Sequence, residues 1–74
     1  MAKKGDTGVY RVTEVIGTST NSWEDAAKNA VATAASTIRD LRIAEVTKFD
    51  MRLDESGKVV QFRTRVSLSF KYEA

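Results

Sequence analysis

An alanine-rich stretch at helical spacing, residues 22–41, most limits what this chain can fold into. Its apolar residues recur at the i, i+3, i+4, i+7 spacing of one helix face: Trp23, Ala26, Ala27, Ala30, Val31, Ala34, Ile38 and Leu41. Ser22 suits the N-cap position, and Asp25 follows three residues later. The pattern predicts one amphipathic helix over residues 22–41. Because alanine is small, this helix can pack closely, and it reads as a structural element without catalytic residues.

Segments rich in β-branched and aromatic residues surround this helix. Residues 9–16 indicate a first strand, residues 42–53 a second and residues 59–72 a third. Residues 17–21 form a turn-rich connection into the helix, and residues 54–57 close a hairpin in which Gly57 can adopt a positive φ. We therefore predict an α+β domain of order β-α-β-β, with a three-stranded antiparallel sheet wrapped on one helix and the third strand in the middle.

Strand alternation predicts which side chains face the helix. In the third strand the helix-facing set is Phe62, Thr64, Val66, Leu68, Phe70 and Tyr72. In the second strand, strict alternation groups Ile43, Glu45, Thr47, Phe49, Met51 and Leu53 on one face, against Ala44, Val46, Lys48, Asp50 and Arg52 on the other. One short helix is too small to cover all this apolar surface, so the remainder predicts subunit contacts.

The composition excludes several classes of function. A chain of 74 residues has a small core, and the absence of cysteine and histidine excludes disulfides and argues against a zinc or copper site. Self-association remains as a way to stabilise such a small core. The net charge of +2 comes from scattered basic residues, which argues against nucleic-acid binding. There is no Gly-rich phosphate loop or nucleophile elbow, so we expect no enzyme. No segment suits a membrane span or a signal peptide, which leaves a cytoplasmic protein as the expectation.

Several short motifs resemble the dodecin family when taken together. They are Tyr10-Arg11-Val12, Val15-Ile16-Gly17-Thr18-Ser19, Ser22-Trp23-Glu24 with Ala26-Ala27, Ala44-Glu45-Val46, and Val66 with Ser69-Phe70. The resemblance implies a dodecin-like domain over residues 9–74 behind a flexible arm of residues 1–8. It also implies a hollow homododecamer, and most dodecins bind flavins in pairs between subunits for storage or protection.

The resemblance departs from the family pattern at the flavin pocket. Flavin-binding dodecins carry a stacking tryptophan where this chain has Ile43, and a ring-binding glutamine where it has Arg63. An aliphatic side chain has no flat π face, and arginine has no acceptor. The chain therefore resembles the branch of the family that lacks the flavin aromatic, including at Ser22-Trp23-Glu24, at Asp50-Met51 and in the turn from Asp54 to Lys58.

Carboxylates around the hairpin turn are the candidate metal ligands. Asp50, Asp54 and Glu55 could supply oxygen ligands to Ca²⁺, with Glu24 and Asp25 as a second possibility. The alternative, which the residues alone favour, is a solvated turn neutralised by the neighbouring basic side chains of Lys48, Arg52 and Lys58.

Two arginines and the tryptophan also allow two interpretations each. Arg63 and Arg65 share one face of the third strand and could bind an anion or form interface ion pairs with Glu14 or Glu45. Trp23 could stack on a ligand, but its place in the helix pattern favours the core.

The sequence thus predicts a non-catalytic, dodecin-like homododecameric shell that binds or stores a small ligand or cation, with Ca²⁺ favoured as the cargo. One alternative is a flavin-storage dodecin with a remodelled pocket. Another is a structural adaptor whose sheet edge recruits a protein partner.

Overall fold

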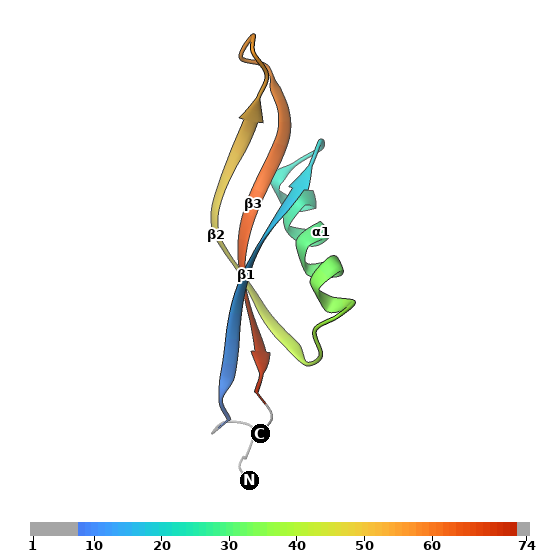
Figure 1. Cartoon of the computed structure of the whole chain (residues 1–74), viewed down its shortest axis with the longest axis vertical. Coiled ribbons are helices and arrows are strands. Elements are labelled where there is room, and N and C mark those ends of the chain that lie inside the picture. Colours follow the sequence, from blue (N-terminus) through green and yellow to red (C-terminus); the bar gives the residue numbers. More distant parts are fainter. Residues whose placement is uncertain (1–7, 73–74) are drawn as a thin grey trace.

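A computed structural model of the chain describes residues 8–72, which form three strands and one helix (Figure 1). The elements are β1 (Tyr10–Ser19), α1 (Trp23–Ala35), β2 (Leu41–Leu53) and β3 (Val59–Lys71). The strands form one antiparallel sheet of order β1-β3-β2. This confirms the predicted class, element order and central position of β3. The predicted arm, residues 1–8, lies outside the described residues except for Gly8, as do residues 73–74.

Helix α1 begins as the sequence predicts. Ser22 is the N-cap, and its hydroxyl accepts a hydrogen bond from the Asp25 backbone N–H at 3.0 Å. Its buried residues are the alanines Ala26, Ala30 and Ala34. The small side chains let the helix lie close to β1, where Gly17 is buried beneath it. The alanine stripe therefore allows the close packing of helix on sheet that its small side chains predict.

The predicted end of the helix is wrong, because α1 stops at Ala35 and not at Leu41. The Ser36 hydroxyl donates to the Thr33 carbonyl at 2.6 Å, and the Thr37 hydroxyl donates to the Ala34 carbonyl at 3.3 Å. Such side-chain bonds compete with the helical ladder. The chain then turns at Asp40, which has a φ of 60°. Leu41 still packs on the core, but as the first residue of β2.

Strand β1 continues three residues beyond its predicted end. Gly17, Thr18 and Ser19 pair with Thr64, Arg63 and Phe62 of β3, so the expected turn is confined to residues 20–22. Glycine, threonine and serine are common in turns, so the sequence pattern placed the end of the strand too early. Gly17 is required by the closeness of the helix and not by a turn, since a Cβ at this position would collide with α1.

The predicted faces of β2 are wrong beyond Val46, because the register shifts between Val46 and Lys48. An unpaired extra residue, Thr47, forms an irregularity of the β-bulge type and inverts the alternation that follows it. The helix-facing set is therefore Ala44, Val46, Phe49 and Met51, which lie opposite Leu68, Val66, Thr64 and Phe62. We call the opposite side of the sheet the outer face; it carries Ile43, Glu45, Lys48, Asp50 and Arg52 of β2.

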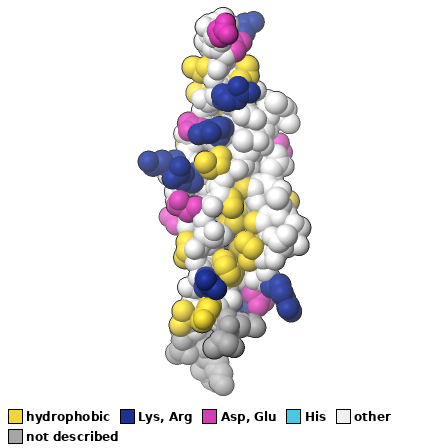
Figure 2. Space-filling view, in the orientation of Figure 1, with side chains coloured by type: hydrophobic (Ala, Val, Ile, Leu, Met, Phe, Trp, Pro, Cys, Tyr) yellow, Lys and Arg dark blue, Asp and Glu magenta, His cyan; other side chains and the backbone are white. Residues whose placement is uncertain are grey.

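The core of one subunit is small. Its buried hydrophobic residues are Ala26, Ala30, Ala34, Val66 and Leu68. The β2–β3 hairpin runs past the end of α1, giving an elongated molecule with extents of 57 × 20 × 17 Å (Figure 1). Hydrophobic side chains remain visible along the molecule between charged ones (Figure 2). Much apolar surface is thus left without a partner in the subunit.

Candidate functional site

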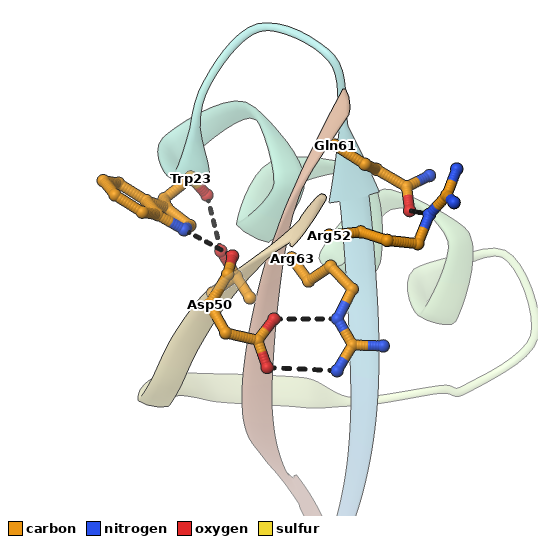
Figure 3. A network of polar contacts seen from close by, with 6 residues as sticks. Trp23, Asp50, Arg52, Gln61 and Arg63 are labelled. Atoms are coloured by element: carbon orange, nitrogen blue, oxygen red, sulfur yellow. Dashed lines mark hydrogen bonds and ion pairs between the residues drawn. The ribbon is translucent and has the colours of Figure 1, made fainter. Parts of the chain in front are cut away.

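The outer face carries a forked ion pair between β2 and β3. Asp50 and Arg63 lie opposite each other in the sheet. The Arg63 Nε donates to Asp50 Oδ1 at 2.7 Å, and its Nη2 donates to Oδ2 at 3.0 Å (Figure 3). The hydrogen bonds and charge of Arg63 lower the pKa of Asp50, with a smaller contribution from Arg65. Asp50 is therefore an ionised, half-exposed carboxylate whose two oxygens are both engaged.

The backbone at Asp50 is held by the helix. The Trp23 indole Nε1 donates to the Asp50 carbonyl oxygen at 2.8 Å (Figure 3). The Trp23 ring also packs against Phe49 and Phe62, with centroid distances of 5.0 and 5.2 Å. The contacts of Trp23 are those of a packing residue that ties the start of α1 to the hairpin. The sequence pattern placed Trp23 on the buried stripe but gave no sign of its bond to Asp50.

Two further polar contacts flank this pair. Arg52 Nε donates to Gln61 Oε1 at 3.2 Å (Figure 3). Arg65 Nη1 lies 3.7 Å from Glu14 Oε1 of β1. Within the subunit Arg65 thus contacts Glu14 and Arg63 pairs with Asp50, while ion pairs or anion binding by these arginines at a subunit interface stay predictions. The outer face thus carries charged side chains of both signs, contributed by all three strands.

The carboxylate of Asp54 organises the hairpin turn. Its Oδ1 accepts from the Ser56 backbone N–H at 2.9 Å, the Ser56 hydroxyl at 2.8 Å and the Lys58 N–H at 3.0 Å. These bonds, led by the Ser56 hydroxyl, lower the pKa of Asp54. Gly57 takes the expected positive φ, at 87°. The Oδ1 atom of Asp54 therefore holds the turn in place, whereas its Oδ2 makes no protein hydrogen bond within residues 8–72.

The second pair of candidate carboxylates sits at the start of α1. The Asp25 Oδ2 accepts from the Ser19 hydroxyl at 2.7 Å and from the Asn29 side-chain amide at 3.5 Å. Asp25 therefore belongs to the network that caps the helix. Glu24 is exposed beside it.

The candidate carboxylates do not form a metal centre within one subunit. Between residues 8 and 72, no three His, Cys, Asp or Glu side chains lie close enough together to hold a metal ion. The donor chemistry nevertheless suits calcium, which takes carboxylate and carbonyl oxygens. A metal site that included Asp50 or Asp54 would therefore need further ligands from outside the subunit.

Comparison with known proteins assigns the family. The sequence pattern of the dodecin family matches residues 9–73. The chain belongs to the dodecin family. A curated relative, calcium dodecin from Mycobacterium tuberculosis, is 44% identical over 63 residues, covering 85% of this chain and 87% of the relative. The family expectation drawn from the sequence motifs is confirmed.

Solved dodecin structures share the fold described above. Dodecin from Streptomyces coelicolor superposes with a TM-score of 0.84 at 37% identity, covering 92% of this chain and 96% of the other. Calcium dodecin from M. tuberculosis, described as calcium-chelating with a novel calcium-binding site, gives 0.77 at 43% identity, covering 88% and 91% of the two chains. No helix within residues 8–72 is long and apolar enough to cross a membrane.

Ile43 and Arg63, interpreted from the sequence as altered flavin-pocket positions, both lie on the outer face in the structure but far apart. Ile43 is opposite Ser69 and is 56% exposed, whereas Arg63 lies six residues earlier on β3. Six residues of extended strand span about 20 Å. One subunit therefore does not join the two positions into one pocket, and a ligand contacting both would have to lie between subunits.

Proposed function

We propose that this dodecin is a subunit of a closed homododecameric shell that binds and stores a small ligand or cation without turnover. Ca²⁺ is the favoured cargo, and the cytoplasm is the proposed location. The 44% identity with calcium dodecin supports this choice of ion. The observation that carries the choice against flavin is Ile43, which presents an exposed aliphatic side chain where ring stacking needs an aromatic one.

Assembly is supported by the imbalance between the core and the apolar surface. Large hydrophobic side chains stay exposed on both sides of the sheet, including Val12 at 62%, Phe49 at 59% and Leu53 at 52%. The two edge strands, β1 and β2, each pair with β3 along one edge, and their other edges have no partner strand within the described chain. Exposed strand edges and apolar patches of this kind are usual in subunit interfaces. In the assembled shell, neighbouring subunits would cover these strand edges and apolar side chains.

The calcium site is proposed to form with Asp50, Asp54 and Glu55 as contributors. Their oxygens are hard ligands, and the half-exposed carboxylate of Asp50 is accessible from solvent. A complete shell of ligands needs carbonyls, waters or carboxylates from a neighbouring subunit. Closure of the shell is what would bring such donors together.

Light scattering tests the assembly. We expect a mass near twelve times the 8.2 kDa of one chain, with no folded monomer on dilution. The small core gives the monomer too little stabilisation of its own. A stable, folded monomer at micromolar concentration contradicts the proposal.

Melting curves with Ca²⁺, Mg²⁺ or chelator test the cargo. Binding only to the folded form stabilises it by about 2.7 kcal/mol at a hundredfold excess of Ca²⁺ over its Kd. Mg²⁺ should stabilise less, since it demands tighter octahedral geometry. Asp50→Asn and Asp54→Asn should reduce the calcium effect. Equal melting points with Ca²⁺ and with chelator rule the site out.

A further inference from the structure

We propose that the hollow between Lys48, Arg63 and Arg65 on the outer face is a binding site for a compact oxyanion of the phosphate class. The ligand is either free inorganic phosphate or the terminal phosphoryl group of a small molecule. This inference goes beyond the proposed calcium cargo and does not depend on it, because the residues that hold the anion are basic and Asp50 only positions one of them.

The charges around the hollow are mostly positive. Lys48, Arg63 and Arg65 all line it, and Asp50 is the one acidic residue of the described chain that does so. Lys48 lies directly opposite Arg65 in the sheet. Like charges at opposite positions of neighbouring strands destabilise a sheet. This arrangement therefore has an electrostatic cost that a bound anion would remove.

The acidic side chains of the subunit leave this excess of positive charge in place. Asp50 neutralises Arg63 through the fork. Arg65 has a looser contact with Glu14, at 3.7 Å, which is longer than a hydrogen bond. Lys48 forms no ion pair within the described chain. Positive charge therefore remains for an anion from solution.

The fork on Asp50 fixes the direction of the remaining Arg63 donors. It uses Nε and Nη2, which leaves the Nη1 amino group without a hydrogen bond to the described chain. Figure 3 shows this amino group directed away from Asp50. A guanidinium that is already held in one orientation loses little freedom when it binds an oxyanion, and its planar donors match phosphate geometry. Asp50 is therefore a positioning residue of the site.

The size of the hollow limits the ligand. Its volume is about 40 Å³. A cavity of about 10–15 Å³ holds one water molecule, so the hollow has room for a compact oxyanion but not for an aromatic ring system. The side chains of Arg63 and Arg65 are 40% and 46% exposed, so an ion can reach their donors without unfolding of the subunit.

Calorimetric titration of the assembled protein with sodium phosphate tests the site. A chelator is present so that calcium cannot bridge protein and phosphate, and sodium chloride of equal ionic strength is the reference. We expect saturable binding of phosphate, whereas chloride should only screen the charges. Glycerol 3-phosphate distinguishes the two ligand sources. Binding as tight as that of inorganic phosphate assigns the hollow to a terminal phosphoryl group, and weaker binding assigns it to the free ion.

Single substitutions identify the residues that hold the anion. We expect Lys48→Gln and Arg65→Gln each to weaken phosphate binding about threefold to tenfold, the loss of one partly exposed charged contact. Arg63→Lys keeps the charge but loses the planar donors, so it should also weaken the binding. Lys58→Gln is the matched control, because Lys58 likewise forms no ion pair within the described chain but lies in the hairpin turn, outside the hollow. It should change the affinity by less than about twofold.

Light scattering checks that every variant assembles as the unmodified protein does. Phosphate binding that is weakened at Lys48 and Arg65 but not at Lys58 supports the site. If phosphate binds no better than chloride, or if Lys58→Gln weakens the binding as much as Lys48→Gln, the inference is overturned while the proposed shell and its calcium cargo stand. The calcium melting curves are measured without phosphate, so a failure there leaves the anion site untouched.

Discussion

Gly17 of β1 lies directly against the Ala26 backbone of α1, so that a Cβ at Gly17 would overlap the Ala26 carbonyl oxygen and lie 2.8 Å from the Ala30 Cβ. Gly17→Ala should therefore push the helix off the sheet. We expect a loss of about 1–3 kcal/mol or more in the free energy of unfolding, the range for overpacked cores. Urea denaturation measures this loss.

Gly57→Ala is the matched control for this substitution. Gly57 has a φ of 87°, but a Cβ there would meet nothing within 4 Å. Its replacement should cost only the backbone penalty of a left-handed residue, about 1–2 kcal/mol. If Gly17→Ala were as mild as Gly57→Ala, the close packing of α1 on β1 would be contradicted.

The sequence was sufficient for the elements and their order because these follow from periodicity. The alanine stripe predicted which helix face is buried, and the predicted helix-facing residues of β3 include the buried Thr64, Val66 and Leu68. The helix end was missed because Ile38 and Leu41 keep the helical spacing. They reach the core from a loop and a strand instead, after the hydroxyls of Ser36 and Thr37 have bonded to the last carbonyls of the helix.

The candidate site was less predictable, since it depends on one unpaired residue. The shift of register at Thr47 decides which side chains of β2 lie on each face beyond it. Nothing in the composition of the strand marks that position. Asp50 was singled out as a carboxylate beside an acidic turn, but its partner Arg63 was assigned to other roles. A pairing across two strands requires the exact register, which alternation alone does not supply.

The bond from Trp23 to Asp50 predicts a separable contribution to stability. Trp23→Phe keeps an aromatic ring near Phe49 and Phe62 but removes the indole N–H that donates to the Asp50 carbonyl at 2.8 Å. We expect a loss of about 1–2 kcal/mol from the lost hydrogen bond and the smaller ring. Trp23→Ala should cost more, because it also removes the aromatic packing. Equal losses in urea denaturation for the two variants would mean that the ring contributes nothing.

The turn at Asp54 predicts a specific loss of stability in acid. Hydrogen bonds from Ser56 and Lys58 lower the pKa of Asp54 below its usual value of 3.8. Its contribution is therefore present above the unfolded-state pKa and is lost as pH falls through the lower folded-state pKa. Asp54→Asn keeps an acceptor oxygen but does not titrate. We expect its melting temperature to fall less than that of the unmodified protein between about pH 5 and pH 2.

Glu55→Gln provides the control in the same turn. Its carboxylate forms no ion pair or side-chain hydrogen bond with the rest of the described chain, so its removal should leave the acid limb of the melting curve unchanged. An acid limb that is identical in the unmodified protein and Asp54→Asn would show that the Asp54 bonds do not contribute to stability.

The outer-face positions Ile43 and Arg63 predict that flavin binding is lost and can be restored. Riboflavin or FMN added to the unmodified protein should keep nearly all of its fluorescence, since Ile43 offers no π face and Arg63 no acceptor. Ile43→Trp together with Arg63→Gln should restore part of the quenching. Ile43 is 56% exposed, so the larger ring can be placed without overpacking the subunit core. Ile43→Leu with Arg63→Gln is the matched control, because it keeps the second change but supplies no ring. If stacking causes the quenching, only the variant with tryptophan should quench. Strong quenching by the unmodified protein would contradict this prediction. It would mean that this dodecin binds flavin through a pocket that does not depend on an aromatic residue at position 43.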